Sequence, residues 1–245
     1  MTFMKRVGAL FIVIIGIELG GCASYVTPGG AVSIPAITEG DISEALAREP
    51  AALFPAQLIV ARVQASGYVS YSNRGYGHGR FSVLTARDIE TEEDFARIGA
   101  MPGIASVGQL SRVLLPAELN SARDLRTAAA QLRGDVVLLY TLDTSFRTDT
   151  VRIGPLQAVG LGFFPNKKAK VTATCAAAFM DVRTGYVYGV AEASATEEQR
   201  SNIWNTQSAL EEARAVAERE AFAGALAEVE KVWSTMLAQH GGDSR

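Results

Sequence analysis

Residues 170–196, KVTATCAAAFMDVRTGYVYGVAEASAT, decide the fold of this chain. Two runs of strand length, Lys170–Met180 and Tyr186–Thr196, flank the short segment Asp181–Gly185. Gly185 can adopt the positive φ angle that a bulged hairpin turn needs, because glycine carries no Cβ atom. The pattern therefore predicts an antiparallel β-hairpin.

The segment that precedes this hairpin predicts a helix and then a central strand. In Ser121–Arg133, Ser121 and Asp124 resemble a capping box, and Gly134 follows where a helix commonly ends. Asp135–Leu142 is apolar on both faces, as is typical of a strand that is covered on both sides. One face of the predicted helix carries apolar residues: Leu125, Ala128, Ala129 and Leu132.

The carboxy-terminal segment predicts a long helix that lies on the sheet. It begins near Asn205–Ser208, where Ser208 and Glu211 form a capping box, and it continues to about Gln239. Two sets of residues recur at helical spacing. They are a small-residue face, Ala213, Ala217 and Ala221, and an apolar stripe, Phe222, Leu226, Val229, Trp233 and Leu237.

Shorter elements are predicted in the first half of the chain, around a loop at Ser66–Gly79. They are a helix at Asp41–Arg48, strands at Gln57–Gln64 and Phe81–Leu84, a helix at Thr91–Ile98 and a strand at Val107–Leu115. We therefore predict one α/β (α+β-like) domain over residues 45–240, followed by a tail at 241–245. Its mostly antiparallel mixed sheet packs against two or more helices.

The amino terminus has the order of a secretory signal. Met1–Arg6 carries two cations and no acid, and the apolar run Val7–Ile17 is shorter than the roughly 20 residues of a membrane-spanning helix. The boundary Leu19-Gly20-Gly21-Cys22 resembles the bacterial lipobox, whose cysteine receives lipid before cleavage. We expect a signal peptide at 1–21, lipid on Cys22 and a flexible tether at 22–44. The alternative is an ordinary secretory signal or signal anchor in which Cys22 is incidental.

Few residues could carry chemistry. Of the two cysteines, Cys22 would be lipidated and Cys175 lies in a strand-like run, so we expect Cys175 to pack in the core. His78 lies near Ser66, Ser70 and Ser72, yet no Gly-x-Ser-x-Gly motif is present. We therefore expect no catalytic residues. The alternative is an envelope hydrolase that uses His78. Metal-ligand spacings are also absent, so we expect no metal and no cofactor.

Two aromatic segments are candidate partner surfaces. The Tyr-rich loop contributes Tyr68, Tyr71 and Tyr76, and the apolar segment 156–165 contributes Phe163 and Phe164. Core packing or a simple loop is the alternative for each segment. The formal net charge of −3 gives no basic excess that would indicate a nucleic-acid partner.

Three segments, Leu138–Phe146, Gly162–Ala173 and Asp181–Glu198, resemble the rhombotarget lipoproteins of proteobacteria. That family is named for its co-occurrence with rhomboid-type processing proteases, so the resemblance implies no activity and transfers no catalytic residue. The helix-Gly-Asp-strand order is more distantly similar to the TolB amino-terminal domain and the curli-secretion lipoprotein, in which a small mixed sheet serves assembly or partner binding.

These resemblances imply a non-enzymatic lipoprotein that binds or scaffolds an envelope protein partner. Ala23 follows the lipobox cysteine where proteins kept at the inner membrane carry Asp, and this favours the outer membrane, with the domain facing the periplasm. A subunit of an oligomeric secretion channel is a further alternative. The sequence does not indicate the oligomeric state.

Overall fold

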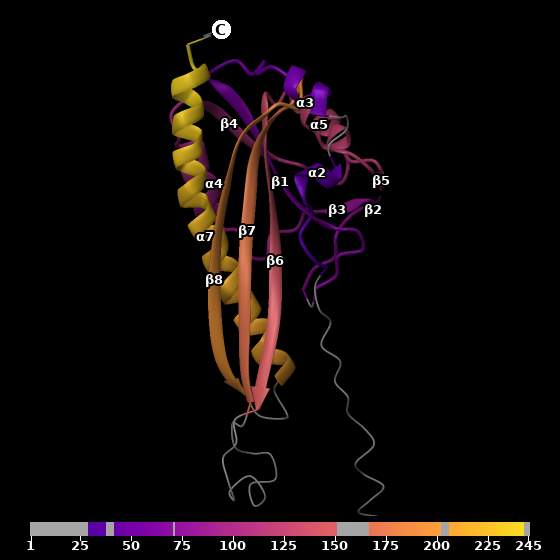
Figure 1. The fold of residues 1–245 in the computed structure, drawn as a ribbon, viewed down its shortest axis with the longest axis vertical. Coiled ribbons are helices and arrows are strands. Elements are labelled where there is room, and N and C mark those ends of the chain that lie inside the picture. Colours follow the sequence, from indigo (N-terminus) through magenta and orange to yellow (C-terminus); the bar gives the residue numbers. More distant parts are fainter. Residues whose placement is uncertain (1–28, 38–41, 71, 151–166, 202–205, 243–245) are drawn as a thin grey trace, which may run out of the picture.

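Three long strands dominate the structure, a computed structural model that describes residues 29–37, 42–70, 72–150, 167–201 and 206–242 (Figure 1). The helices are α2 (Ile34–Ile37), α3 (Ile42–Ala47), α4 (Glu92–Gly99), α5 (Ala122–Gln131) and α7 (Thr206–His240). The strands are β1 (Ala56–Ala65), β2 (His78–Gly79), β3 (Phe81–Leu84), β4 (Ile104–Gln109), β5 (Glu118–Leu119), β6 (Val136–Thr150), β7 (Lys167–Asp181) and β8 (Val187–Ser201).

The main sheet has the order β3-β1-β6-β7-β8, and β4 pairs with β1 as well. β3 and β4 share one side of β1, because β4 pairs with Ala56–Val60 and β3 pairs with Arg62–Ala65. β4 and β6 run parallel to β1, and the other pairs in this sheet are antiparallel. The predicted α+β fold, with a mostly antiparallel mixed sheet and a long carboxy-terminal helix, is confirmed.

The edge of β6 changes partner partway along the strand. Within β6, only Val136–Tyr140 pairs with β1, whereas the whole of β6 pairs with β7. Beyond Tyr140, the side chain of Gln64, near the end of β1, forms the next contacts with β6. Its Nε2 donates to the carbonyl oxygen of Leu142 at 3.0 Å, and the Leu142 amide donates to its Oε1 at 3.4 Å. The rest of β6 projects past β1 with its hairpin partners.

Helices cover the two faces of the sheet in separate layers. α7 crosses one face diagonally, and the predicted small-residue face is confirmed because its three alanines are fully buried (Figure 1). α5 and α2 pack on the other face through Leu125, Ala128 and Ile37. β1 alternates between the two layers, with Leu58 and Val60 facing α7 and residues 59, 61 and 63 facing α5. The domain therefore has two hydrophobic cores, one on each side of the sheet.

The single described cysteine lies in the core on the α7 side, as predicted. Cys175 is buried, and burial raises the pKa of its thiol to about 12. The thiol therefore stays protonated at neutral pH, and packing is the role that the structure supports.

The hairpin turn between β7 and β8 is organised by one buried carboxylate. Asp181 accepts hydrogen bonds from the amides of Arg183 and Thr184 at 2.8 and 3.0 Å within the turn. It also accepts from the Ala51 amide and the Tyr188 hydroxyl, both at 2.7 Å. Gly185 has a φ of 73°, so the predicted glycine turn is confirmed.

Replacing Asp181 with alanine should lower the free energy of unfolding by about 2–4 kcal/mol, because several donors would lose a charged acceptor in a buried position. Urea denaturation followed by circular dichroism measures the change. Arg183→Ala is the matched control in the same turn, since its side chain is exposed, and it should change stability by less than about 0.5 kcal/mol. Equal effects of the two variants would contradict this role of Asp181.

Two sequence predictions are wrong at their boundaries. β4 spans 104–109 and residues 111–115 form turns, because parallel pairing with β1 sets the strand and local alternation does not. By contrast, α7 begins at Thr206, in agreement with the predicted start near Asn205–Ser208. The tether prediction is wrong for residues 29–37, where Val32 and Ile37 are buried.

Candidate functional site

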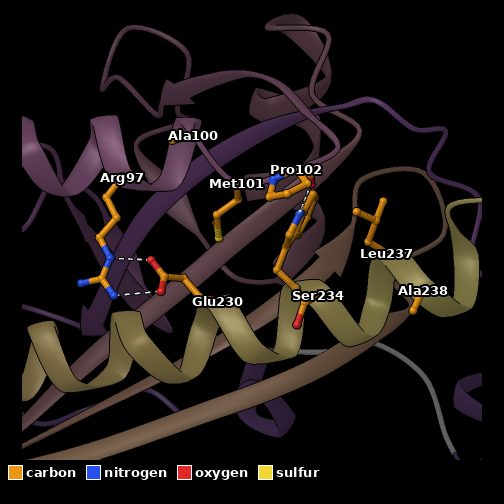
Figure 2. A pocket seen from close by; sticks show the side chains of 9 residues that line it. Arg97, Ala100, Met101, Pro102, Glu230, Ser234, Leu237 and Ala238 are labelled. Carbon is orange, nitrogen blue, oxygen red and sulfur yellow. Dashed lines mark hydrogen bonds and ion pairs between the residues drawn. The ribbon is translucent and has the colours of Figure 1, made fainter.

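A groove lies between the end of α4 and the last turns of α7 (Figure 2). It encloses about 570 Å³ and is lined mainly by apolar groups of Ala100, Met101, Pro102, Leu237 and Ala238, with Trp233 beneath them. Such hollows with few polar groups are the usual shape of ligand and partner sites.

Trp233 holds the two walls of the groove together. Its Nε1 donates to the carbonyl oxygen of Pro102 at 2.8 Å, and its ring lies 5.8 Å from that of Phe54 and 5.3 Å from that of Phe179. Gly103 follows with a φ of 79°, and a Cβ atom there would come within 2.7 Å of Leu237. The groove is therefore preformed by packing on the sheet.

One end of the groove carries a bidentate ion pair. The guanidinium of Arg97 faces the carboxylate of Glu230, with Nη2 and Oε2 2.8 Å apart and a second hydrogen bond from Nε (Figure 2). The hydrogen bond to Glu230 raises the pKa of Arg97. A half-exposed pair adds little stability, but its planar geometry gives the groove a polar end. The groove therefore suits a bound molecule that has an apolar group next to a polar one.

A second feature is a cluster of charged side chains buried between β1, β6 and α7. Arg62 is 1% exposed, and its Nη1 lies 2.6 Å from Asp88 and 3.4 Å from Glu90. Its Nη2 lies 3.5 Å from Glu218, which also pairs with Arg214. The cluster links the sheet, the loop that follows β3 and the first half of α7.

Burial and charge compete in setting the pKa values of the cluster. Burial raises the pKa of Glu218 above its ordinary value, although Arg214 and Arg62 oppose this shift. Burial acts in the same direction on Asp88, but there the charge of Arg62 dominates the opposing effects and the pKa is lowered. Burial also raises the pKa of Tyr140, whose hydroxyl donates to Glu90. The cluster is largely buried, with the Asp88 side chain 10% exposed, so its arrangement is that of a structural cross-link.

The sequence carries a signal for this cluster, although the signal is not a recognised motif. Arg62 interrupts the apolar strand Gln57–Gln64. It follows Leu58 and Val60 at a spacing of two residues, and both of these face the core on the α7 side. Arg214 and Glu218 are four residues apart on one helix face. Their convergence depends on the loop after β3, which contributes Asp88 and Glu90 without any periodic pattern.

The predicted aromatic surface is wrong for Tyr68. Its side chain is 1% exposed and lies beneath the loop, with the guanidinium of Arg62 6.0 Å from its ring, because the loop folds back onto β3. Tyr76 is partly buried and its hydroxyl donates to the carbonyl oxygen of Leu115 at 3.3 Å. The other predicted site residues lie outside the described residues: Leu19, Gly20, Gly21, Cys22, Tyr71, Phe163 and Phe164.

His78 is exposed in β2, which pairs with β5. The serines near it in sequence have other partners: Ser70 Oγ donates to the carbonyl oxygen of Asn73 at 3.2 Å, and Ser72 Oγ accepts from Arg214 at 3.4 Å. Within residues 42–70 and 72–150, no hydrogen bond joins His78 to either serine.

None of the described helices combines the length and apolar character needed to span a bilayer. Across the same part of the chain, no three His, Cys, Asp or Glu side chains gather in a way that could hold a metal ion.

No family model matches this chain, and no curated protein matches it significantly. Solved structures give distant likenesses. A protein from Helicobacter pylori described as a neuraminyllactose-binding hemagglutinin homolog is 8% identical with a TM-score of 0.37, over 79% of this chain and 91% of that chain. A protein from Caulobacter crescentus described as a lipoprotein is 16% identical with a TM-score of 0.26, over 47% of this chain and 77% of that chain.

PelC from Paraburkholderia phytofirmans, a dodecamer in its crystals, is 15% identical with a TM-score of 0.29, over 81% of this chain and 95% of that chain. All three TM-scores are below 0.5. These likenesses therefore transfer neither a site nor an activity to this chain.

Proposed function

We propose that this chain is a lipid-anchored lipoprotein of the bacterial outer membrane that faces the periplasm. In this role it is non-enzymatic and binds or scaffolds another envelope protein. The observation that carries the proposal is the lipobox Leu19-Gly20-Gly21-Cys22 behind a secretory signal. The resemblance to the rhombotarget lipoproteins supports the same assignment.

The described domain suits a protein held close to a membrane surface. Its first described residue, Gly29, follows Cys22 by seven positions, so the two Cα atoms are at most about 25 Å apart. Several acyl chains on one cysteine would hold the protein almost permanently, whereas one chain binds only marginally. The domain would then present its grooves to neighbouring envelope proteins without inserting into the bilayer.

The groove beside Trp233 is the surface that we assign to the protein partner. Its apolar lining is preformed, and the Arg97–Glu230 pair at its end can orient a polar group of the partner. This assignment replaces Tyr68 as a contact residue, because Tyr68 is buried.

Intact mass and membrane fractionation test the anchor. Expressed in a proteobacterial host, the wild-type chain should have the mass of an acylated protein that begins at Cys22, and it should sediment with the outer membrane. Cys22→Ala should lose both the added mass and the outer-membrane location. A wild-type chain of unmodified mass in the soluble fraction would overturn the proposal.

The two alternatives make different predictions. For an envelope hydrolase, His78→Ala would abolish activity while the fold is retained, whereas our proposal expects no loss of function. For a subunit of a secretion channel, the detergent-extracted protein would form rings, and a strict monomer would count against that role.

A further inference from the structure

A second apolar hollow lies on the sheet face opposite α7. It encloses about 490 Å³ where the amino-terminal segment meets β6, β7 and β8. Val32, Ile34 and Ile37 form one wall, and Leu139, Ala178 and Val190 belong to the sheet beneath and beside them. This hollow is separate from the groove beside Trp233.

The hollow lies where the described residues cover only part of this face. Ile37 packs on the sheet with residues of β1 and β6, so the layer is closed there. Over β7 and β8, the small side chains of Ala176 and Ala178 leave space above the sheet. The side chain of Val190 is 67% exposed there. An apolar surface of this kind gains free energy when an occupant removes it from water.

Ser33, Thr141 and Glu192 are polar residues of the lining, and Thr141 already has hydrogen-bond partners. Thr141 Oγ1 donates to Gln64 at 2.8 Å and accepts from the amide of Val32 at 3.2 Å. A polypeptide inserted here would bring backbone amides and carbonyls that need hydrogen bonds, and burial without them is costly. A hydrocarbon chain has no such requirement, so its chemistry suits the lining better.

The chain enters the domain along the wall of this hollow. The carbonyl oxygen of Gly30 accepts from the amide of Ala65 at 3.0 Å, and Val32 is fixed two residues later by Thr141. Cys22 precedes Val32 by ten residues, which places the two Cα atoms within about 35 Å of each other. Lipid on Cys22 would therefore be tethered within reach of the hollow.

We infer that one acyl chain carried by Cys22 folds back into the hollow formed by the amino-terminal segment and β6–β8. This inference rests on the lipidation proposed above. Methylene groups are removed from water in the hollow, as they are in the bilayer. Moving one acyl chain from the bilayer to the hollow therefore costs little hydrophobic free energy. The remaining chains keep the protein on the membrane.

Photo-crosslinking of the lipidated full chain tests the inference. Cells that incorporate a palmitate analogue with a diazirine near its tail are irradiated, and the purified protein is digested and analysed by mass spectrometry. We expect crosslinks within the chain to the peptides that carry residues 32–37 and 176–192. Val190→Glu should reduce these crosslinks at least about tenfold, because it replaces an apolar lining residue with a charged one.

Val113→Glu is the matched control, since Val113 is 87% exposed and does not line the hollow. Its crosslinks should equal those of the wild type. Intact mass separates the two proposals: an unlipidated chain would overturn both. A lipidated chain that crosslinks only to phospholipid, or equally in Val190→Glu, would overturn the acyl-chain inference and leave the anchor standing.

Discussion

Arg62→Ala should lower the free energy of unfolding by about 3–5 kcal/mol, which is the usual cost of removing one member of a buried ion pair. The substitution would leave Asp88 and Glu90 without their shared cation. Glu218 would lose one of the two arginines beside it. Arg214 would remain, but it already pairs with Glu211 and Glu218, and it lies 3.8 Å from Asp88.

Urea denaturation of Arg62→Ala measures this effect, and Arg87→Ala is its control. Arg87 also pairs with a carboxylate, that of Glu92, but the pair is at the surface and should contribute no more than about 1 kcal/mol. If both variants changed stability by the same small amount, the buried cluster would not hold β1 to α7.

Trp233→Ala should have a comparable effect, a loss of about 3–5 kcal/mol, because it removes a large side chain from a packed core. Trp233 is 1% exposed and contacts both Phe54 and Phe179, so these rings cannot close the cavity without moving strands. The hydrogen bond to Pro102 is lost as well, which releases the turn that forms one wall of the groove.

Trp233→Phe separates the two contributions, since it keeps most of the ring and loses the hydrogen bond. Its cost should be smaller than that of the alanine variant, and thermal unfolding of both variants would measure the difference. An alanine variant as stable as the phenylalanine variant would show that packing at Trp233 contributes little to the fold.

Local chemistry made much of this fold predictable. The hairpin follows from Gly185 and two strand-like runs, and the cap of α5 follows from Asp124, which accepts from the Ser121 amide at 3.0 Å. The spacing of small residues in α7 predicted its contact with the sheet. In each case, the decisive interaction joins residues close in sequence or repeats with a regular period.

The errors come from contacts between distant segments. The bounds of β4 depend on parallel pairing with β1, and the burial of Tyr68 depends on how its loop returns to β3. The segment around Val32 has no apolar period and so predicts a tether, yet a hydrogen bond to Thr141 fixes Val32 on the sheet. The groove beside Trp233 leaves no pattern in the sequence for the same reason, since its walls lie far apart along the chain.

The projecting part of β6, with β7 and β8, also has a mechanical consequence. Residues 141–150 of β6 lie beyond its pairing with β1, so the arm extends about 33 Å. A ladder of hydrogen bonds runs the length of the arm, and α7 braces it diagonally. An arm stiffened in this way resists bending. A force applied at its tip would therefore move the whole domain as one unit.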